Sequence, residues 1–194
     1  MKISILLPYK ENFSPEYPGA VSLFVNDTSR LSKYKKNIII YGNTNYKKTF
    51  NLNYKNINLS KIRFSSQSKR YVAEFYKLEK EKNSDLIEIH NRPNYLFTLI
   101  PKLGKKNYVI YFHNDPLTMA GSKSVNERKY LLKNCYKIVF NSNWSKKRFL
   151  EGMQNKFVNS GKLLVVFQSA KKKKINLRDK KKIITFVGKL NRAK

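Results

Sequence analysis

The fold is decided by the stretch Tyr108-Val109-Ile110-Tyr111-Phe112-His113-Asn114-Asp115-Pro116. Its first five residues are apolar or aromatic, which is typical of a β-strand. His113 follows the apolar run directly, and Asn114 and Asp115 continue into a loop. In parallel α/β sheets, ligands bind at the carboxyl ends of the strands. This stretch therefore predicts a strand with chemically capable side chains at its carboxyl end.

Similar apolar runs recur along the chain, and stretches with helical spacing lie between them. The predicted strands are 3–7, 38–41, 62–64, 85–89, 108–112, 137–140, 163–167 and 183–187. The predicted helices are 19–31, 68–82, 93–103, 125–134 and 142–151. Segment 44–60 is polar and rich in Asn, and we expect a loop with at most one strand. Strands that alternate with helices of this length imply a parallel sheet with right-handed crossovers, an α/β Rossmann-like fold flanked by helices.

The first predicted helix, 19–31, carries apolar residues at helical spacing. We expect one buried face made of Val21, Phe24, Val25, Thr28 and Leu31.

The chain of 194 residues is long enough for one sizeable core and a small remainder. We expect an N-terminal domain over 1–168, a Lys-rich linker over 169–182, and the first strand of a second domain over 183–194. This last segment ends in a Gly turn followed by two cations, which is the kind of turn where an α/β fold holds phosphate. The expectation is that the second domain is cut just after it begins.

The formal charge of +29 is extreme for a globular chain. One interpretation is an anionic partner, such as nucleic acid, a membrane surface or a phosphorylated substrate. The other is genome composition, because Lys, Asn, Ile, Tyr and Phe all have AT-rich codons. Either way, the charge would favour peripheral contact with anionic lipid head groups. Cys135 is the single cysteine, and no apolar run reaches the length of a membrane span, so we expect a cytoplasmic protein.

Polar residues also follow the predicted strand 85–89. Glu88 and His90 share one face by strand alternation, and Asn91 and Arg92 fall in the loop that leads to the next helix. One interpretation is a hydrogen-bonded core His with helix-capping neighbours, and the other is a substrate site. Since the two histidines of the chain both stand at strand ends, we favour a functional role for His113.

Two further strand ends lead into helices. Gly19 and Ala20 open helix 19–31, where a helix N-terminus favours an anionic group and Gly lets it approach the backbone. Asn141 follows strand 137–140, and Ser142 or Asn143 would cap the next helix. The sequence has no Cys/His metal spacing, no phosphate-binding Walker pattern and no serine-hydrolase elbow, so no metal site is predicted.

The order of these segments resembles that of the retaining glycosyltransferases of family 4, which have the two-domain GT-B fold. The matching segments are the first strand with Gly19-Ala20-Val21, Tyr111-Phe112-His113-Asn114-Asp115-Pro116, Phe140-Asn141-Ser142-Asn143-Trp144-Ser145, and Phe186-Val187-Gly188-Lys189-Leu190-Asn191-Arg192-Ala193-Lys194. The last is the most specific. In the family its Gly is usually followed by Arg, where this chain has Lys189, and Lys lacks the planar fork of Arg.

The resemblance implies transfer of a sugar from a nucleotide-sugar donor, with retention, to an envelope glycan such as lipopolysaccharide or to a lipid-linked acceptor. The nucleotide sugar is a substrate, and no cofactor is implied. His113 would contact the donor sugar, and Lys189 and Lys194 would neutralise the diphosphate leaving group.

The remaining roles follow from the same resemblance. Gly19, Ala20, Gly188 and Asn141 would lie on the donor side. Glu88, Asn91 and Arg92 would lie on the acceptor side. Because the donor's nucleotide pocket would belong to the second domain, residues 1–194 alone are expected to be inactive.

Two other classes stay open. A basic nucleic-acid-binding α/β domain is compatible with the charge and the thirteen tyrosines. Against it, the aromatic residues follow the apolar periodicity, and no RNA-binding or helix-turn-helix pattern occurs. The third class is a non-catalytic sugar-binding scaffold.

Overall fold

A computed structural model describes residues 1–59, 65–154, 157 and 160–168. The strands are β1 Ile3–Leu6, β2 Ile38–Gly42, β3 Tyr54–Asn56, β4 Leu86–His90, β5 Asn107–Phe112, β6 Lys137–Phe140 and β7 Leu163–Val165. The α-helices are α1 Ala20–Leu31, α2 Gln67–Lys82, α3 Leu96–Leu103, α4 Val125–Asn134 and α5 Asn143–Leu150. Three short 3-10 helices join them: η1 Lys35–Asn37, η2 Pro93–Tyr95 and η3 Pro116–Thr118.

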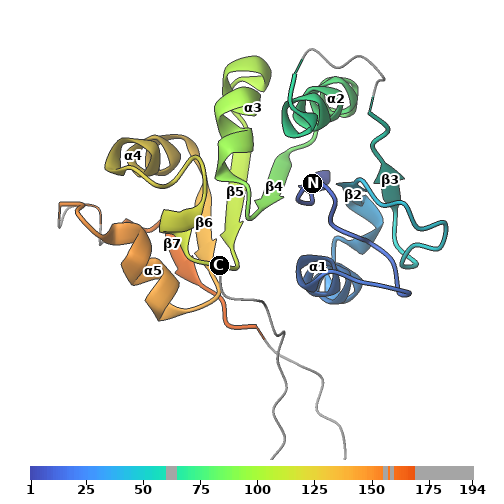
Figure 1. Cartoon of the computed structure of the whole chain (residues 1–194), viewed down its shortest axis with the longest axis horizontal. Coiled ribbons are helices and arrows are strands. Elements are labelled where there is room, and N and C mark those ends of the chain that lie inside the picture. Colours follow the sequence, from blue (N-terminus) through green and yellow to red (C-terminus); the bar gives the residue numbers. More distant parts are fainter. Residues whose placement is uncertain (60–64, 155–156, 158–159, 169–194) are drawn as a thin grey trace, which may run out of the picture.

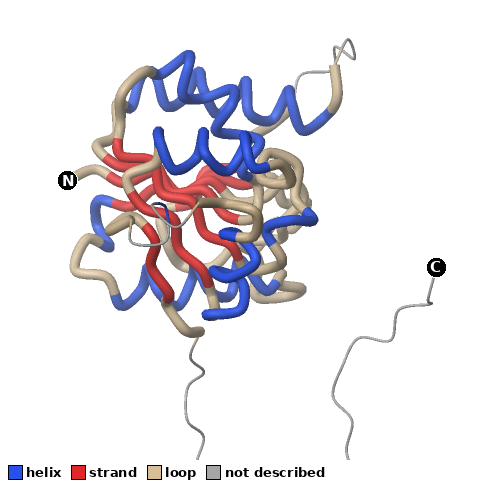
Figure 2. Tube along the Cα trace, turned by 90° about the vertical axis from the view of Figure 1, so that its left-hand side faces the viewer, coloured by secondary structure: helices blue, strands red, loops and turns tan. Residues whose placement is uncertain are grey.

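The strands form one seven-stranded sheet in the order β3-β2-β1-β4-β5-β6-β7, and every adjacent pair is parallel (Figure 1). The direction of strand order reverses between β1 and β4, where ligands bind in open α/β sheets. Figure 2 shows the sheet between two layers of helices. The predicted Rossmann-like α/β fold is therefore confirmed.

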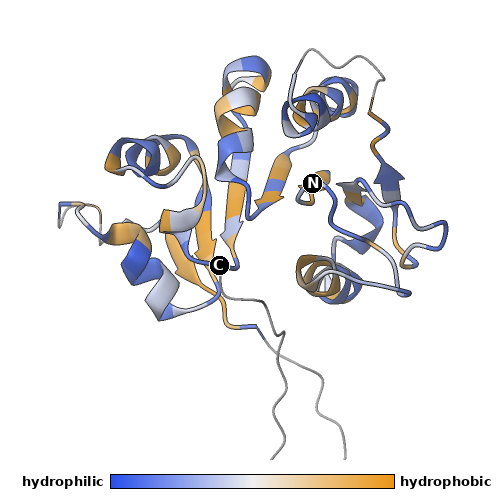
Figure 3. Cartoon of the chain, viewed as in Figure 1, coloured by the Kyte–Doolittle hydropathy of each residue, from blue (hydrophilic) through white to orange (hydrophobic). Residues whose placement is uncertain are grey.

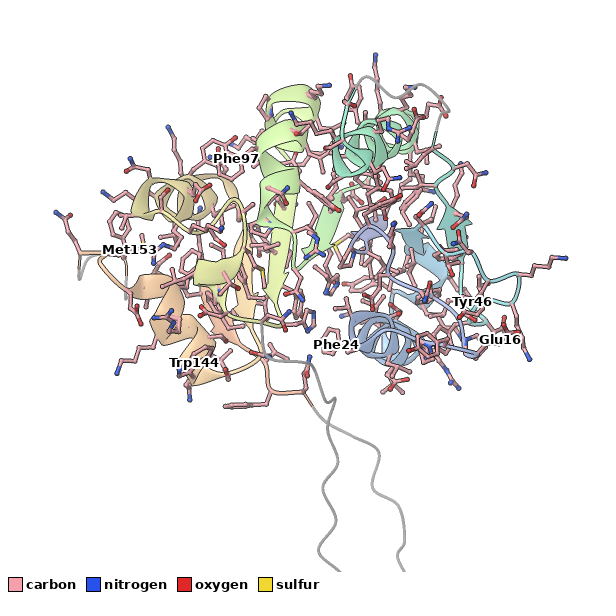
Figure 4. The ribbon with its side chains drawn as sticks, viewed as in Figure 1. Glu16, Phe24, Tyr46, Phe97, Trp144 and Met153 are labelled. Carbon is pink, nitrogen blue, oxygen red and sulfur yellow. The ribbon has the colours of Figure 1, made fainter. Side chains whose placement is uncertain are left out.

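Two apolar clusters hold the layers together, one on each face of the sheet. The larger unites buried residues of β4, β5 and β6 with α2, α3 and α4. The smaller joins β1 and β2 to α1 through Val21 and Val25. The central strands are accordingly among the most apolar parts of the ribbon, whereas the edge strand β3 is hydrophilic (Figure 3). Aromatic contacts extend this packing, such as Phe97 of α3 stacked on Tyr130 of α4 with 4.5 Å between ring centroids (Figure 4).

Some predicted boundaries differ from the structure. The predicted strand 163–167 ends at Val165. Segment 44–60, expected to be a loop with at most one strand, contains in its described residues the single strand β3, which pairs with β2. The predicted helix 93–103 begins as η2, because Pro93 occupies its first turn. The predicted strands 62–64 and 183–187, the linker 169–182 and segment 183–194 lie outside the described residues.

The buried face of α1 differs from the one its apolar spacing predicts. The buried residues are Val21, Ser22, Val25, Asn26 and Ser29, most of them small or polar. Leu31 is 89% exposed and Thr28 is exposed as well, so both expectations were wrong. The helix is rotated so that Phe24 points toward the ends of β4 and β5 (Figure 4).

Within the described part of the chain, none of the helices has both the length and the apolar character needed to cross a membrane. The same residues contain no cluster of three or more His, Cys, Asp or Glu side chains that could hold a metal ion.

Candidate functional site

Two adjoining clefts open at the carboxyl edge of the sheet. The switch-point cleft has a volume of about 430 Å³ and is lined by Pro8, Glu11, Ala20, Val21, Asn91, Arg92, His113, Asn114 and Gln168. The η3 cleft has a volume of about 390 Å³ and is lined by Ser68, Asn91, Arg92, Asn94, Asn114, Thr118, Met119 and Ala120. Asn91, Arg92 and Asn114 line both clefts, so one wall separates them. This is the edge where the strand-end rule places ligands.

A chain of hydrogen bonds runs through both histidines. His90 Nε2 lies 2.8 Å from Glu88 Oε1, and His90 Nδ1 lies 2.8 Å from His113 Nε2. His113 Nδ1 lies 2.8 Å from Gln168 Nε2 at the switch-point cleft. The His90 side chain is fully buried, whereas that of Glu88 is 20% exposed. Strand alternation correctly predicted that Glu88 and His90 share a face, and β5 brings His113 beside them.

Aromatic rings enclose the two imidazoles. The Tyr111 ring stacks on the His90 ring, with 5.0 Å between the ring centroids. The His113 ring lies edge to edge with the His90 ring, with 5.1 Å between centroids and 24° between the ring planes. Phe24 contacts His113 edge-on at 5.0 Å. Burial, and then the neighbouring His90, lower the pKa of His113 to about 3. His113 is therefore a neutral imidazole at physiological pH.

Asn91 holds the loop between β4 and η2. Its φ is +52°, in the left-handed region where Asn is tolerated better than most residues. Its backbone N–H donates to the Tyr111 carbonyl at 2.9 Å, and its Oδ1 accepts from the His113 N–H at 2.8 Å. Asn141 completes the arrangement, because its Nδ2 donates to the His113 carbonyl at 2.8 Å. The His113 backbone is thus fixed from both neighbouring strands.

The N-terminus of α1 faces the switch-point cleft and is already capped. Glu11 Oε1 accepts hydrogen bonds from the Ser22 N–H at 3.0 Å and the Ser22 hydroxyl at 3.2 Å. A Cβ on Gly19 would collide with the Glu11 carboxylate. Gly19 thus allows a close approach to the backbone, and in this structure the approaching group is the Glu11 carboxylate of the same chain.

A surface ion pair supports the loop after β5. The Arg148 guanidinium lies 3.1 Å from Asp115 Oδ2. Desolvation raises the pKa of the Asp115 carboxyl, but the hydrogen bonds from Arg148 and from the Leu117 N–H, together with the Arg148 charge, outweigh it and lower that pKa. Asp115 also caps η3 by accepting from the Leu117 N–H at 3.0 Å. Asp115 therefore shapes the loop between the two clefts.

The structure brings several predicted site residues together. Ala20, Asn91, Arg92 and His113 line the switch-point cleft, with Gly19 directly behind Ala20. Among the described residues that line the two clefts, Glu88 and Asn141 do not occur. Glu88 instead contacts His90, and Asn141 contacts the His113 carbonyl. The predicted roles of Gly188, Lys189 and Lys194 fall outside the described residues.

Three polar residues that line the switch-point cleft were missed by the sequence analysis. Gln168 follows the predicted strand 163–167 directly, so the strand-end rule could have found it. Asn114 follows His113 and was quoted without a role. Glu11 lies in a long loop, and no sequence signal distinguishes it from other loop carboxylates.

No protein-family model and no curated protein sequence matches this chain. Solved structures do match its fold. HepE of Anabaena, in complex with UDP and glucose, has a TM-score of 0.59 at 16% identity, over 88% of this chain and 45% of its own length. UDP-GlcNAc 2-epimerase of Methanocaldococcus jannaschii has a TM-score of 0.52 at 16% identity, over 86% of this chain and 45% of its own.

A glycosyltransferase of Rickettsia africae has a TM-score of 0.50 at 16% identity, over 86% of this chain and 43% of its own length. The chain thus spans somewhat less than half the length of the structures that it matches. The likeness supports a Rossmann-like α/β fold for the seven-stranded parallel sheet of this chain.

Proposed function

We propose that this chain forms the N-terminal lobe of a GT-B glycosyltransferase, which transfers a sugar from a nucleotide-sugar donor to an envelope glycan or lipid-linked acceptor. The observation that carries the proposal is the switch-point cleft, in which His113, Asn91 and the N-terminus of α1 converge. Its fold-level support is the match to HepE, whose structures contain UDP and UDP-glucose. Retention at the anomeric carbon and membership of family 4 belong to the proposal and rest on the sequence motifs.

The donor is proposed to occupy the switch-point cleft. Its sugar would contact His113, and its diphosphate would approach Gly19 and Ala20 at the α1 N-terminus. Gly188 and Asn141 are proposed on the same side, although Asn141 acts here on the His113 carbonyl. Lys189 and Lys194 are proposed to neutralise the leaving group, which gains negative charge as the glycosidic bond breaks.

The acceptor is proposed to occupy the η3 cleft. Its lining is dominated by amide and hydroxyl side chains, which both donate and accept hydrogen bonds as sugar hydroxyls require. Asn91 and Arg92 lie in the wall shared with the donor cleft, where the reacting groups would meet. An acceptor role for Glu88 has weaker support, because its carboxylate contacts His90.

The charge of +29 supports a peripheral position on an anionic membrane face. Sedimentation with vesicles containing phosphatidylglycerol, at low and high salt, measures this. We expect binding that weakens as salt rises, because screening shortens the range of the attraction. Equal sedimentation with neutral and anionic vesicles would contradict the membrane proposal alone.

Transfer itself is tested with the protein expressed from its genomic locus, including any coding sequence that follows codon 194. The purified protein is incubated with radiolabelled UDP-sugars and membrane extract, and label is counted in the glycan and lipid fractions. We expect transfer by a protein that contains both lobes and none by residues 1–194 alone. Efficient transfer by residues 1–194, or the absence of any donor lobe, would overturn the proposal.

The same assay separates transfer from epimerisation. Label that stays in the nucleotide-sugar fraction while the sugar changes configuration would favour the chemistry named in the epimerase match. Label that moves into a glycan or lipid supports transfer. Tight, sequence-specific binding of RNA or DNA in a salt titration would instead favour the nucleic-acid class.

A further inference from the structure

We propose that Glu88 and His90 are positioning residues that hold His113 in a single neutral tautomer, with its proton on Nε2 and a lone pair on Nδ1. His113 then presents a hydrogen-bond acceptor to the switch-point cleft. The ligand group that it recognises must be a donor, such as a sugar hydroxyl, and not a phosphate oxygen. The identity of this ligand rests on the proposed function, whereas the tautomer does not.

The direction of the hydrogen bonds is set at the Glu88 end of the series that links Glu88, His90, His113 and Gln168. An ionised carboxylate only accepts hydrogen bonds. Glu88 Oε1 lies 2.8 Å from His90 Nε2, so this nitrogen carries a proton that it donates to the carboxylate. In the proposed arrangement His90 carries this one proton, which makes its Nδ1 an acceptor. His113 Nε2 lies 2.8 Å from that Nδ1 and must donate to it. A neutral imidazole has one N–H, so Nδ1 of His113 carries a lone pair.

The hydrogen bond at the Gln168 end of the series agrees with this direction. The Gln168 amide nitrogen lies 2.8 Å from His113 Nδ1, and an amide NH₂ is a donor. Gln168 is exposed and lines the cleft, so it can yield its place to a ligand hydroxyl. The Gln168 amide thus marks where a ligand donor would sit.

Packing keeps the two rings in register. His90 is fully buried between Tyr111, which stacks on it, and Phe24, whose ring centroid lies 6.0 Å away. The His113 N–H and carbonyl are held by Asn91 and Asn141. Hydrogen-bond partners of one ring nitrogen commonly orient a histidine and determine which of its nitrogens carries the proton.

The consequence concerns donor selectivity. A lone pair on His113 attracts a hydroxyl hydrogen and repels an electronegative atom that has none. A site built around an acceptor therefore discriminates against ligands that lack the matching donor.

Nitrogen NMR of the histidine-labelled chain measures the tautomer directly. Because the chain has two histidines, the spectrum contains two imidazole systems. At neutral pH we expect both rings to show a protonated Nε2 and an unprotonated Nδ1. A protonated Nδ1 on His113, or a doubly protonated ring, would overturn the proposal without any variant.

Glu88→Gln tests the role of the carboxylate with almost no change of shape. The Gln amide can either accept from or donate to His90, so we expect the Nδ1-protonated form of His113 to become populated. Gln168→Ala is the matched control at the other end, and it should leave both rings protonated on Nε2. A Glu88→Gln spectrum identical to the wild type would refute the positioning role.

A ligand experiment tests the functional consequence in the enzyme that contains this chain. We compare binding of UDP-glucose with that of its singly deoxyfluorinated analogues, in which fluorine replaces one sugar hydroxyl. At one ring position we expect a loss of about tenfold or more, and a smaller loss in Glu88→Gln. Equal tolerance of fluorine at every position would contradict acceptor-based selection. Failure of every nucleotide sugar tested to bind would count against the proposed function, and the NMR result would still decide the tautomer.

Discussion

The two edges of the sheet use their polar residues for different purposes. At the amino edge, the Lys162 ammonium donates to the Leu132 carbonyl at 2.7 Å, and the Lys106 ammonium donates to the Ser84 carbonyl at 3.0 Å. At the carboxyl edge, His90, His113 and Asn91 hold one another and leave polar atoms facing two clefts. The lysines thus donate to carbonyl groups near the C-terminal ends of α4 and α2. The histidines and amides instead present polar atoms to the clefts.

The amino edge shows why high charge does not mark the site. A cleft of about 530 Å³ there is lined by Lys105, Lys106, Lys133 and Lys162. Helices α3 and α4 both end at this cleft. The C-terminus of a helix carries partial negative charge. Lysines at these positions neutralise the helix ends, which accounts for their presence without an anionic ligand. The position of a residue along its strand is the better guide to the site.

The largest expected effect on stability lies near the amino edge, at Glu79. Its fully buried carboxylate accepts hydrogen bonds from the Ser4 hydroxyl at 2.5 Å and from the Ser84 N–H at 2.7 Å. Glu79→Ala leaves the buried Ser84 N–H without its acceptor and the Ser4 hydroxyl with only the Ser84 hydroxyl as a partner, so we expect a loss of about 3 kcal/mol in urea unfolding. Exposed Glu81 on the same helix is the control, and Glu81→Ala should change stability by less than about 0.5 kcal/mol. Equal losses of unfolding free energy in the two variants would show that the hydrogen bonds of Glu79 do not stabilise the amino edge.

Activity should respond at the opposite edge. His113→Ala removes the acceptor from the switch-point cleft, and we expect kcat/KM for transfer to fall by about 100-fold. Lys162→Ala at the amino edge should leave it within about twofold. The comparison is made in the enzyme that contains this chain, with thermal melts to confirm that both variants are folded. A greater loss in Lys162→Ala would reverse the functional assignment of the two edges.

The pH dependence of stability gives a third test. Burial holds the pKa of His113 at about 3, below its ordinary value of 6.5, so the unfolded chain binds the proton more readily. Stability contributed by the neutral ring is therefore complete above pH 6.5 and is lost as the pH falls toward 3. Between these values we expect the wild type to lose up to about 1.4 kcal/mol per pH unit more than His113→Gln. Parallel curves from urea unfolding would show that His113 is not held neutral by the fold.

The smallest expected effect concerns Glu11, which caps α1 within the switch-point cleft. Its carboxylate stands where a donor phosphate would approach, and like charges repel. Glu11→Gln keeps an oxygen for the Ser22 N–H and removes the charge, so we expect UDP-glucose to bind about fivefold more tightly. Glu16→Gln in the same loop is the control, because Glu16 is exposed and does not line the cleft. Calorimetry that shows weaker binding in Glu11→Gln would place the phosphates elsewhere.

Much of the fold could be predicted because its signals are local. Apolar runs of four to six residues, such as that of β5, alternate with helical stretches, and this pattern suffices to predict a parallel sheet. The strand-end rule then found His113, Asn91 and Arg92. Alternation along β4 placed Glu88 and His90 on one face before any contact was known.

What could not be predicted depends on contacts between distant segments. The hydrogen bond between His90 and His113 requires the pairing of β4 with β5. The capping of α1 by the Glu11 carboxylate requires the loop after β1 to fold back onto that helix. The buried face of α1 was predicted from apolar spacing, but Phe24 contacts the histidines while Ser22 and Asn26 are buried. Such tertiary contacts override local preference.

Hydrogen exchange of the enzyme that contains this chain, with and without UDP-glucose, shows which edge of the sheet binds the nucleotide sugar. We predict that the nucleotide sugar slows exchange in peptides covering 88–95 and 111–118 at the carboxyl edge. Peptides covering 103–108 and 132–137 at the lysine-rich amino edge should not change. Protection confined to the amino edge, or no protection at either edge, would show that the nucleotide sugar does not bind at the carboxyl edge.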